Sequence, residues 1–348
     1  MDNPSMLTPL ISNHKRYAES YLVYCKLNRS VEMIERWINS YFPEKIMKDI
    51  KVDKEKELMV LGIGSGSGYY IIIYVMTFVL SNMCFHDSLS DRWPDGQSLS
   101  LTFECFLSVK ISFLSVQFPL LLSSGQVECQ VLRQLLKQWP KITDTVVEPN
   151  RSHINAYQDL AANESESLNG VSFEWRQLNL QKFRQENHDQ PLKKYHFIML
   201  FHVMYYFENL AEDLKYLKSI LEDGGMILAI MESDDGSVTR SIEQFPQFKK
   251  NVSAVSTKDV EKALAKVKIQ FVKHRIQINL DASGFLDGES KEGDLLVDFI
   301  TQTAFFRETA SDSLYNDIIE YLKRIVLPEC DNGKSQLRCD CEVIVITK

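Results

Sequence analysis

Short apolar runs alternate with amphipathic stretches along most of this chain. Continuous apolar runs are typical of strands that are buried on both faces of a parallel sheet. Between them, stretches such as LAEDLKYLKSILED repeat apolar residues at helical spacing, and Gly224-Gly225 is the expected stop of that helix. Buried strands are predicted at 58–63, in TDTVVEP, at 196–207 and at 226–232. This alternation predicts an α/β fold with a mainly parallel sheet and helices on both faces.

Further elements flank this alternating core. Residues 14–42 are predicted to be helical, with a break at Asn28-Arg29-Ser30 after which Ser30 caps a second helix. Beyond the core, the pattern predicts a helix from Ser256-Thr257, a strand at 269–280, helices at 294–306 and 312–327, and a final strand from Cys341 to Thr347.

A glycine-rich loop follows the first predicted strand directly. Gly64, Gly66 and Gly68 permit a sharp turn and a close approach of the backbone to a ligand, which a Cβ atom would prevent. Such a loop normally opens a helix whose N–H groups face the ligand. Here the amphipathic helix begins only at Gln126, after a long apolar stretch.

Spacing indicates that the stretch is an insertion. A nucleotide-binding βαβ unit places an acidic residue at the end of its second strand, about 20 residues after the glycines. Glu148 ends the run TDTVVEP but lies 80 residues after Gly68; omission of the 57 residues from Tyr69 to Gly125 reduces this separation to 23. The shortened chain is an unbroken strand, glycine loop, helix and strand.

The insert 69–125 is poor in charge and rich in Phe, Leu and Ser. Gly68-Tyr69 can be encoded with a splice donor, and SFLSVQFPLLLSSG can be encoded by a pyrimidine-rich tract that ends in an acceptor. We interpret the insert as a translated retained intron; the alternative is a long lineage-specific loop. Its apolar run from Tyr69 to Leu80 is shorter than the about 20 residues of a membrane-spanning helix.

Composition narrows the class of protein. The chain has 348 residues and a net charge of −8, without a basic stripe, which argues against nucleic acid and anionic membranes as partners. Its seven cysteines lack the spacing of a zinc site, so no metal and free thiols in a reducing compartment are expected. The N-terminal residues contain no apolar segment of signal-peptide length. We therefore expect a cytoplasmic globular protein.

Aromatic residues mark the end of the strand at 196–207. The order FHVMYYF, helix, Gly-Gly and apolar strand is the order found around the cofactor of S-adenosylmethionine-dependent methyltransferases. Tyr205 and Tyr206 can either pack at a rim or form an aromatic wall that favours a sulfonium and a cationic substrate. A nicotinamide-dependent oxidoreductase shares the glycine loop and stays as an alternative enzyme class.

Outside the insert, the chain resembles the histamine N-methyltransferase family. The resemblance rests on HKRYAESY, the GxGxG loop, VVEP, the FxW pattern, MYY, GDLLVDFIT and the final strand. It implies a class I methyltransferase fold with an added substrate-covering subdomain, in which residues 1–56 form a helical cap, residues 57–348 the methyltransferase domain and 235–340 contain the covering elements. It also implies a monomer that methylates a ring or amine nitrogen of a small molecule without a metal.

The resemblance assigns the cofactor S-adenosylmethionine to particular residues. Gly64 and Glu148 match residues that hold the cofactor. His153 stands where the family has a polar contact, and Phe201 where an aliphatic residue backs the adenine. Leu180 lies near a family serine whose contact this chain lacks.

The resemblance also indicates an altered acceptor site. Tyr205 and Tyr206 match acceptor-site tyrosines, and His202 replaces a glutamine as the one catalytic candidate, unless it is only structural. Ser30 stands where the family has a glutamate for the substrate amine, and Cys339 where it has an asparagine. A family tryptophan after the fifth strand is also missing. Histamine itself is therefore expected to be a poor acceptor, and a catalytically impaired or non-enzymatic relative is the third alternative.

Overall fold

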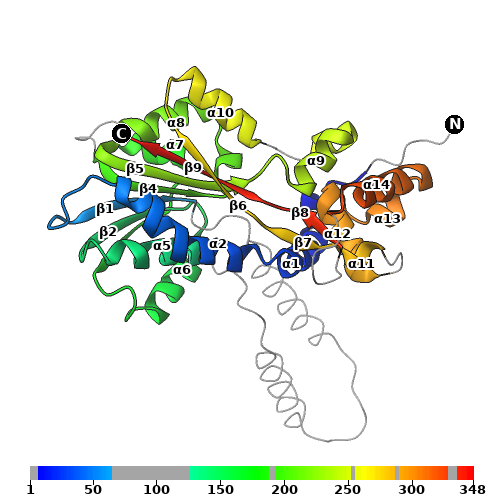
Figure 1. The fold of residues 1–348 in the computed structure, drawn as a ribbon, viewed down its shortest axis with the longest axis horizontal. Coiled ribbons are helices and arrows are strands. Elements are labelled where there is room, and N and C mark those ends of the chain that lie inside the picture. The colour runs from blue at the N-terminus through cyan, green and yellow to red at the C-terminus, as the bar shows by residue number, and fades with distance from the viewer. Residues whose placement is uncertain (1–6, 65–124, 188–192, 252–254, 287–289, 328–334) are drawn as a thin grey trace, which may run out of the picture.

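The computed structural model describes residues 7–64, 125–187, 193–251, 255–286, 290–327 and 335–348. Gly66, Gly68 and all of the predicted insert except Gly125 lie outside these described residues. The described chain forms a sheet with helices on both faces and a second, mainly helical lobe beside it (Figure 1).

The central sheet has seven strands in the order β3-β2-β1-β4-β5-β9-β6. Strands β1 to β5 pair in parallel, and the last strand, β9, inserts antiparallel between β5 and β6. This order, with its one reversed strand, is that of the class I methyltransferase fold and confirms the predicted architecture. The strands are β1 (Leu58–Ile63), β2 (Ile142–Val147), β3 (Val171–Arg176), β4 (Tyr195–Phe201), β5 (Leu221–Glu232), β6 (Val272–Ile276) and β9 (Cys341–Thr347).

Alternate residues of the central strands supply two separate cores. In β4, Phe197 and Met199 face one apolar cluster, while Ile198 and Leu200 face the other. The first cluster is completed by α2 (Ser30–Tyr41), α5 (Gln126–Leu136) and α6 (Arg151–Asn163). The second is completed by α7 (Leu180–Glu186), α8 (Leu210–Ser219) and α10 (Thr257–Lys266).

The unit β1–α5–β2 confirms the register deduced from spacing. Helix α5 begins at Gln126, and β1 pairs with β2 in parallel from Leu58↔Ile142 to Ile63↔Val147. The helix that belongs after the glycine loop is therefore the one that follows the insert.

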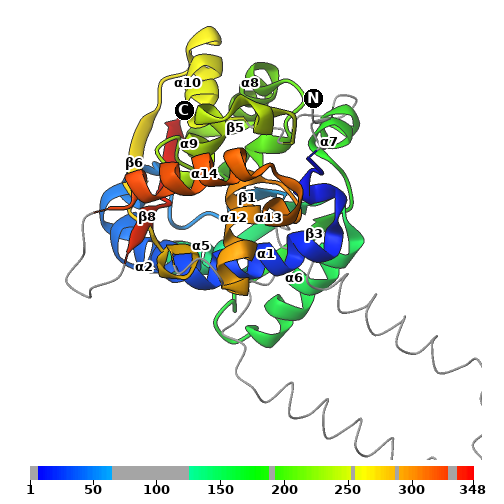
Figure 2. The same cartoon turned by 90° about the vertical axis from the view of Figure 1, so that its right-hand side faces the viewer.

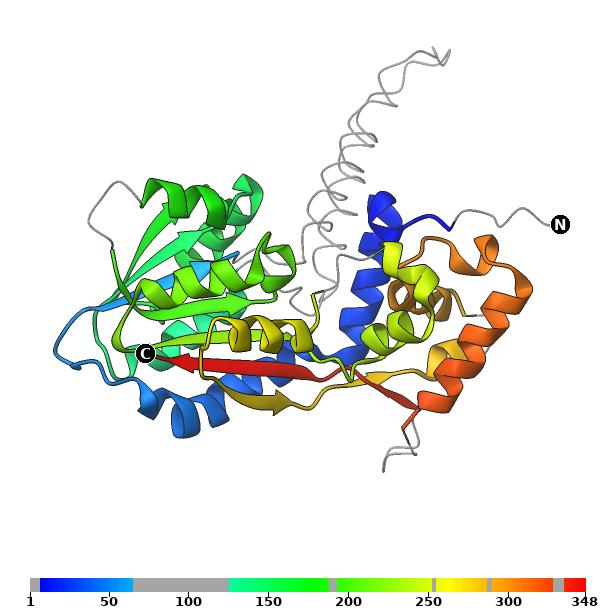
Figure 3. The ribbon, with the colours of Figure 1, turned by 90° about the horizontal axis from the view of Figure 1, so that it is seen from above.

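A second lobe stands beside the sheet, and Figure 2 shows it facing the viewer. Figure 3 shows the extended segments β6–β7 and β8–β9 running between the two lobes. Helix α1 packs on α12 of this lobe, whereas α2, the next helix in sequence, packs on α5 under the sheet. The lobe contains α1 (His14–Asn28), α9 (Ser237–Gln244), α11 (Ser283–Leu286), α12 (Lys291–Thr301), α13 (Phe306–Thr309), α14 (Asp312–Ile325), β7 (Asn279–Asp281) and β8 (Gln336–Arg338).

The strand predicted at 269–280 is two strands, β6 and β7. The ladder is interrupted at Ile278, whose backbone N–H donates to Oδ1 of Asp340 at 3.0 Å. Because a side chain takes the place of a backbone acceptor, the ribbon breaks where it passes from the sheet to the second lobe.

The glycine pair Gly224-Gly225 was wrongly predicted to end a helix. Helix α8 ends at Ser219, and both glycines lie within β5. A Cβ atom at Gly224 would lie 2.8 Å from the carbonyl oxygen of Lys51, and one at Gly225 would lie 2.7 Å from that of His196. Close approach of neighbouring backbone therefore explains these glycines.

Ser30 does not cap the second helix as predicted. Arg29 is the N-cap residue of α2, in the left-handed region at φ 50°, and its side chain makes no capping hydrogen bond. Instead, the side chain of Asn28 accepts the backbone N–H of Ser30 at 2.8 Å. Asn28 is the last residue of α1, so one side chain stabilises the junction of both helices.

Within the described ranges, none of the helices is both long and apolar enough to cross a membrane.

Candidate active site

The candidate site lies at the carboxyl ends of the parallel strands, beginning with Gly64 after β1. Its backbone N–H donates to the carbonyl oxygen of Val147 at 2.8 Å, which joins the ends of β1 and β2. Its φ of 67° is in the left-handed region, and a Cβ atom there would lie 2.3 Å from Cγ2 of Val203 beyond β4. Gly64 is therefore required both by its conformation and by its close packing.

Replacement of Gly64 by alanine should destabilise the protein by about 1–3 kcal/mol, because a left-handed alanine is strained and its methyl group meets Val203. Thermal unfolding measures the loss. Gly284→Ala is the matched control, since a Cβ atom there has no neighbour closer than 3.8 Å. Equal melting temperatures for the two variants would contradict the interpretation of Gly64.

Gly125 lies at the start of the helix that belongs after the glycine loop, and the sequence pattern did not single it out. It is the N-cap residue of α5 with φ 85°, and a Cβ atom there would lie 2.1 Å from Cδ2 of Tyr157. Removal of 68–124 and removal of 69–125 give the same product, because residues 68 and 125 are both glycine. The glycine at the start of α5 therefore completes the GxGxG pattern of the shortened chain, and this identity was visible in the sequence.

Glu148 follows β2 directly and lies beside the Gly64 turn. Its side chain is 5% exposed, and its Oε1 accepts the backbone N–H of Asn150 at 2.9 Å. His153, on the first turns of α6, places Nδ1 3.5 Å from the same oxygen and is equally buried. The structure thus brings Gly64, Glu148 and His153 together at the ends of β1 and β2. A glycine turn next to an acidic strand end fits the ribose of a nucleoside cofactor.

Phe201 and Leu180 are both buried, on opposite faces of the sheet. Phe201 ends β4 within the cluster under α5 and α6, close to the strand ends that carry Gly64. Leu180 begins α7 and packs in the other cluster with Val147 and Phe183. Its apolar surroundings agree with the expected lack of a polar contact at this position.

His202 follows β4 in the left-handed region, at φ 49°. Its backbone N–H donates to the carbonyl oxygen of Ile230 at 2.8 Å, and its ring stacks with that of Tyr205 at 6.5 Å between centroids. Burial lowers the pKa of His202 from 6.5 to about 4. The imidazole is therefore neutral near pH 7 and can accept a hydrogen bond there, but it holds a proton poorly.

The low pKa of His202 makes stability depend on pH. Since the folded state disfavours the charged ring, the contribution of the neutral ring to stability is complete above pH 6.5 and is lost as the pH falls towards 4. Between pH 6.5 and 4, the free energy of unfolding should therefore fall by on the order of 2 kcal/mol less in the His202→Gln variant than in the wild type. Urea unfolding of both proteins across this range measures it, and parallel pH profiles would contradict it.

The two tyrosines of the turn η4 (Met204–Tyr206) differ in exposure. Tyr206 is 67% exposed, whereas the Tyr205 hydroxyl accepts the backbone N–H of Glu232 at 2.7 Å. The two rings meet edge to face at 6.5 Å. Tyr205 is thereby held against the end of β5, and Tyr206 is open to a ligand.

Cys339 lies beside the end of β5 as well. It is 2% exposed, and its Sγ is 3.4 Å from Oγ of Ser237. Burial, together with the nearby carboxyl of Glu232, raises the pKa of this thiol to about 12, so the thiol is neutral. The structure therefore places Cys339 near Glu232, a residue that the sequence analysis missed. The sequence contained a signal for Glu232, because this residue ends the apolar run MILAIME just as Glu148 follows the apolar residues of TDTVVEP.

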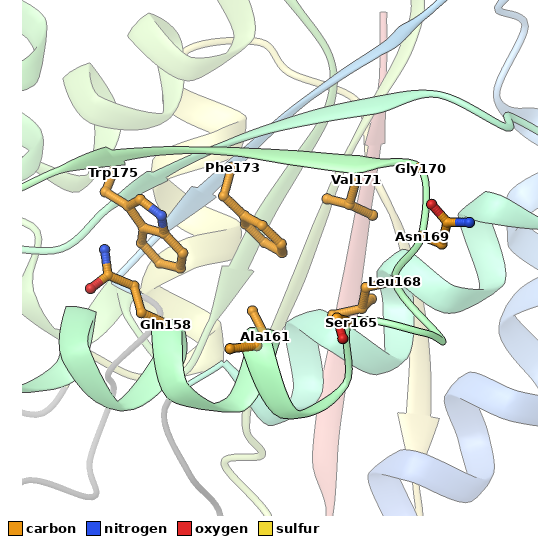
Figure 4. A pocket seen from close by; sticks show the side chains of 10 residues that line it. Gln158, Ala161, Ser165, Leu168, Asn169, Gly170, Val171, Phe173 and Trp175 are labelled. Carbon is orange, nitrogen blue, oxygen red and sulfur yellow. The ribbon is translucent and has the colours of Figure 1, made fainter.

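A cavity of about 400 Å³ opens elsewhere, between α6 and β3 at the edge of the sheet (Figure 4). Phe173 and Trp175 stack in its wall at 5.2 Å between ring centroids. None of its lining residues is a predicted cofactor or acceptor residue. The FxW pattern thus belongs to this separate hollow.

Comparison with known proteins agrees with this geometry. The family model described as "Methyltransferase domain" matches residues 35–268, about two-thirds of the chain. Histamine N-methyltransferase A of Xenopus laevis is 24% identical over 349 residues, which cover 98% of each chain.

Two further relatives match shorter parts of the chain. Histamine N-methyltransferase of Bos taurus is 28% identical over 230 residues, 64% of this chain and 78% of that one. Carnosine N-methyltransferase 2 of Gallus gallus is 27% identical over 218 residues, 61% of this chain and 66% of that one. The chain belongs to the methyltransferase-domain family, as a class I methyltransferase similar to the histamine N-methyltransferases.

Proposed function

We propose that this enzyme moves a methyl group from S-adenosylmethionine to a nitrogen of a small acceptor with an imidazole ring or an amine. The observation that carries the proposal is the juxtaposition at the strand ends. The Gly64 turn after β1 and Glu148 after β2 form one side, and the tyrosine turn η4 follows β4, the strand that neighbours β1 on its other side. Histamine and carnosine, after which the relatives are named, both contain an imidazole ring.

Several residues are suited to hold the methyl donor. Gly64 lets the backbone approach it, the Glu148 carboxylate can accept both ribose hydroxyls, and Phe201 offers an apolar surface to the adenine. His153 is placed to fix the Glu148 carboxylate. When bound, S-adenosylmethionine supplies a methyl group activated by its sulfonium.

The remaining site residues are suited to align the acceptor. A neutral ring nitrogen attacks in line, so alignment supplies most of the acceleration. The exposed face of Tyr206 can pack against the acceptor ring, and His202, neutral at physiological pH, can accept a hydrogen bond from its second nitrogen. The proton then leaves to solvent, because the low pKa of His202 does not favour its storage. We further propose that the second lobe covers the acceptor and that the enzyme is a cytoplasmic monomer.

Calorimetry with S-adenosylhomocysteine, followed by methyl transfer to histamine and carnosine, tests the proposal. The protein lacking 69–125 is measured beside the full chain. Binding followed by ring methylation is expected for the shortened protein. Binding without turnover on either acceptor would favour an impaired relative, and binding of reduced nicotinamide cofactor alone would favour an oxidoreductase.

A further inference from the structure

Glu232, the last residue of β5, carries a carboxylate without a cationic partner. Its Oε1 accepts the hydroxyl hydrogen of Tyr24 at 3.2 Å, and its backbone N–H donates to Tyr205. Across the described part of the chain, no lysine, arginine or histidine lies within ion-pair distance of it. By contrast, Glu342 on the neighbouring strand pairs with both Lys273 and Arg275.

An aromatic cluster of the second lobe reaches this carboxylate through the Tyr24 hydroxyl. Tyr24 of α1 stacks on Phe299 of α12 at 4.3 Å between centroids, and Tyr21 meets the same ring at 5.5 Å. From the sheet side, the Tyr205 hydroxyl meets the backbone N–H of Glu232. Glu232 thus lies where the second lobe meets the strand ends, next to the turn that carries the exposed Tyr206.

A carboxylate next to an aromatic cluster is suited to an ammonium group. Aromatic rings attract a cation, and the carboxylate supplies the opposite charge. Burial raises the pKa of Glu232 to about 7, so ionisation of the side chain is disfavoured until a cation compensates it. A bound cation would therefore stabilise the ionised Glu232 carboxylate.

We propose that Glu232 binds the protonated amine of the methyl acceptor and thereby determines its specificity. The proposal rests on the methyl-transfer function above. The family resemblance places an amine-binding glutamate at position 30, where this chain has Ser30. In this chain, Glu232 at the end of β5 supplies the carboxylate that the family has at the start of α2. The favoured acceptor therefore directs its ammonium group towards the end of β5.

Glu232→Gln tests this assignment, because glutamine retains the size of the side chain and an acceptor for the Tyr24 hydroxyl. Calorimetry measures binding of histamine and of 4-methylimidazole, which lacks the amine, to the protein saturated with S-adenosylhomocysteine. Mildly alkaline pH keeps the amine charged and Glu232 ionised. The matched control is Glu55→Gln, the same change at an exposed position before β1, at the opposite end of the strands.

Histamine should bind Glu232→Gln about ten- to a hundredfold more weakly than wild type, as expected for loss of a charged hydrogen bond. 4-Methylimidazole and S-adenosylhomocysteine should bind both proteins equally, and Glu55→Gln should match wild type. Equal histamine affinity in wild type and Glu232→Gln would overturn the assignment and leave methyl transfer intact. Absence of S-adenosylhomocysteine binding to wild type would instead overturn the proposed function, and this assignment with it.

Discussion

Replacement of Glu148 by glutamine should weaken binding of S-adenosylhomocysteine about ten- to a hundredfold. The side chain is 5% exposed at the end of β2, so solvent weakens its interactions little. A hydrogen bond to a charged acceptor contributes about 1.5–3 kcal/mol, which corresponds to this range of affinity. Isothermal titration calorimetry on the protein lacking 69–125 measures the change.

The glutamine variant separates a binding effect from a structural one. Its amide oxygen can still accept the Asn150 N–H that Glu148 accepts at 2.9 Å, so the turn into α6 should persist. Melting temperatures should therefore stay close to that of the parent protein. Unchanged affinity for S-adenosylhomocysteine in a folded variant would show that Glu148 does not hold the cofactor.

Deletion of 69–125 should improve cofactor affinity by about tenfold or more and reduce aggregation. The first N–H groups of α5 are suited to face the cofactor, as in other helices that follow a glycine loop. The 57 inserted residues separate this helix from Gly68 in the sequence. The apolar insert also adds surface that favours association. Light scattering and calorimetry on the full and shortened proteins measure the two effects.

The geometry at Gly125 makes this deletion well defined. Gly68 takes the N-cap position where any side chain would meet Tyr157, so the strand, turn and helix can close without a new contact. The matched control is a deletion of 70–126, which removes Gln126 and leaves Tyr69 at the start of the helix. Unfolding of the 69–125 deletion, or a dominant transcript that contains these codons, would contradict the retained-intron hypothesis.

Part of the candidate site could be predicted from sequence because its signals are local. A glycine after a buried strand and an acid after the next strand follow from chain direction in a parallel sheet, and the structure places Gly64 and Glu148 side by side. Glu232 was missed because its importance depends on Tyr24, which lies 208 residues away in sequence. Ser30 was misassigned as a cap because the competing Asn28 side chain takes that role only in the folded junction.

Sequence alone determined the α/β class, the parallel core and the register across the insert, since apolar periodicity and strand direction are properties of neighbouring residues. The family resemblance was carried by motifs in the same way. Only the tertiary structure decided the position of β9 between β5 and β6, the break at Ile278 and the meeting of α1 with the strand ends. These features depend on long-range packing and on burial of charge, which raises the pKa of Glu232 and lowers that of His202. No local pattern specifies such environments, because each is made by segments that fold together from distant parts of the chain.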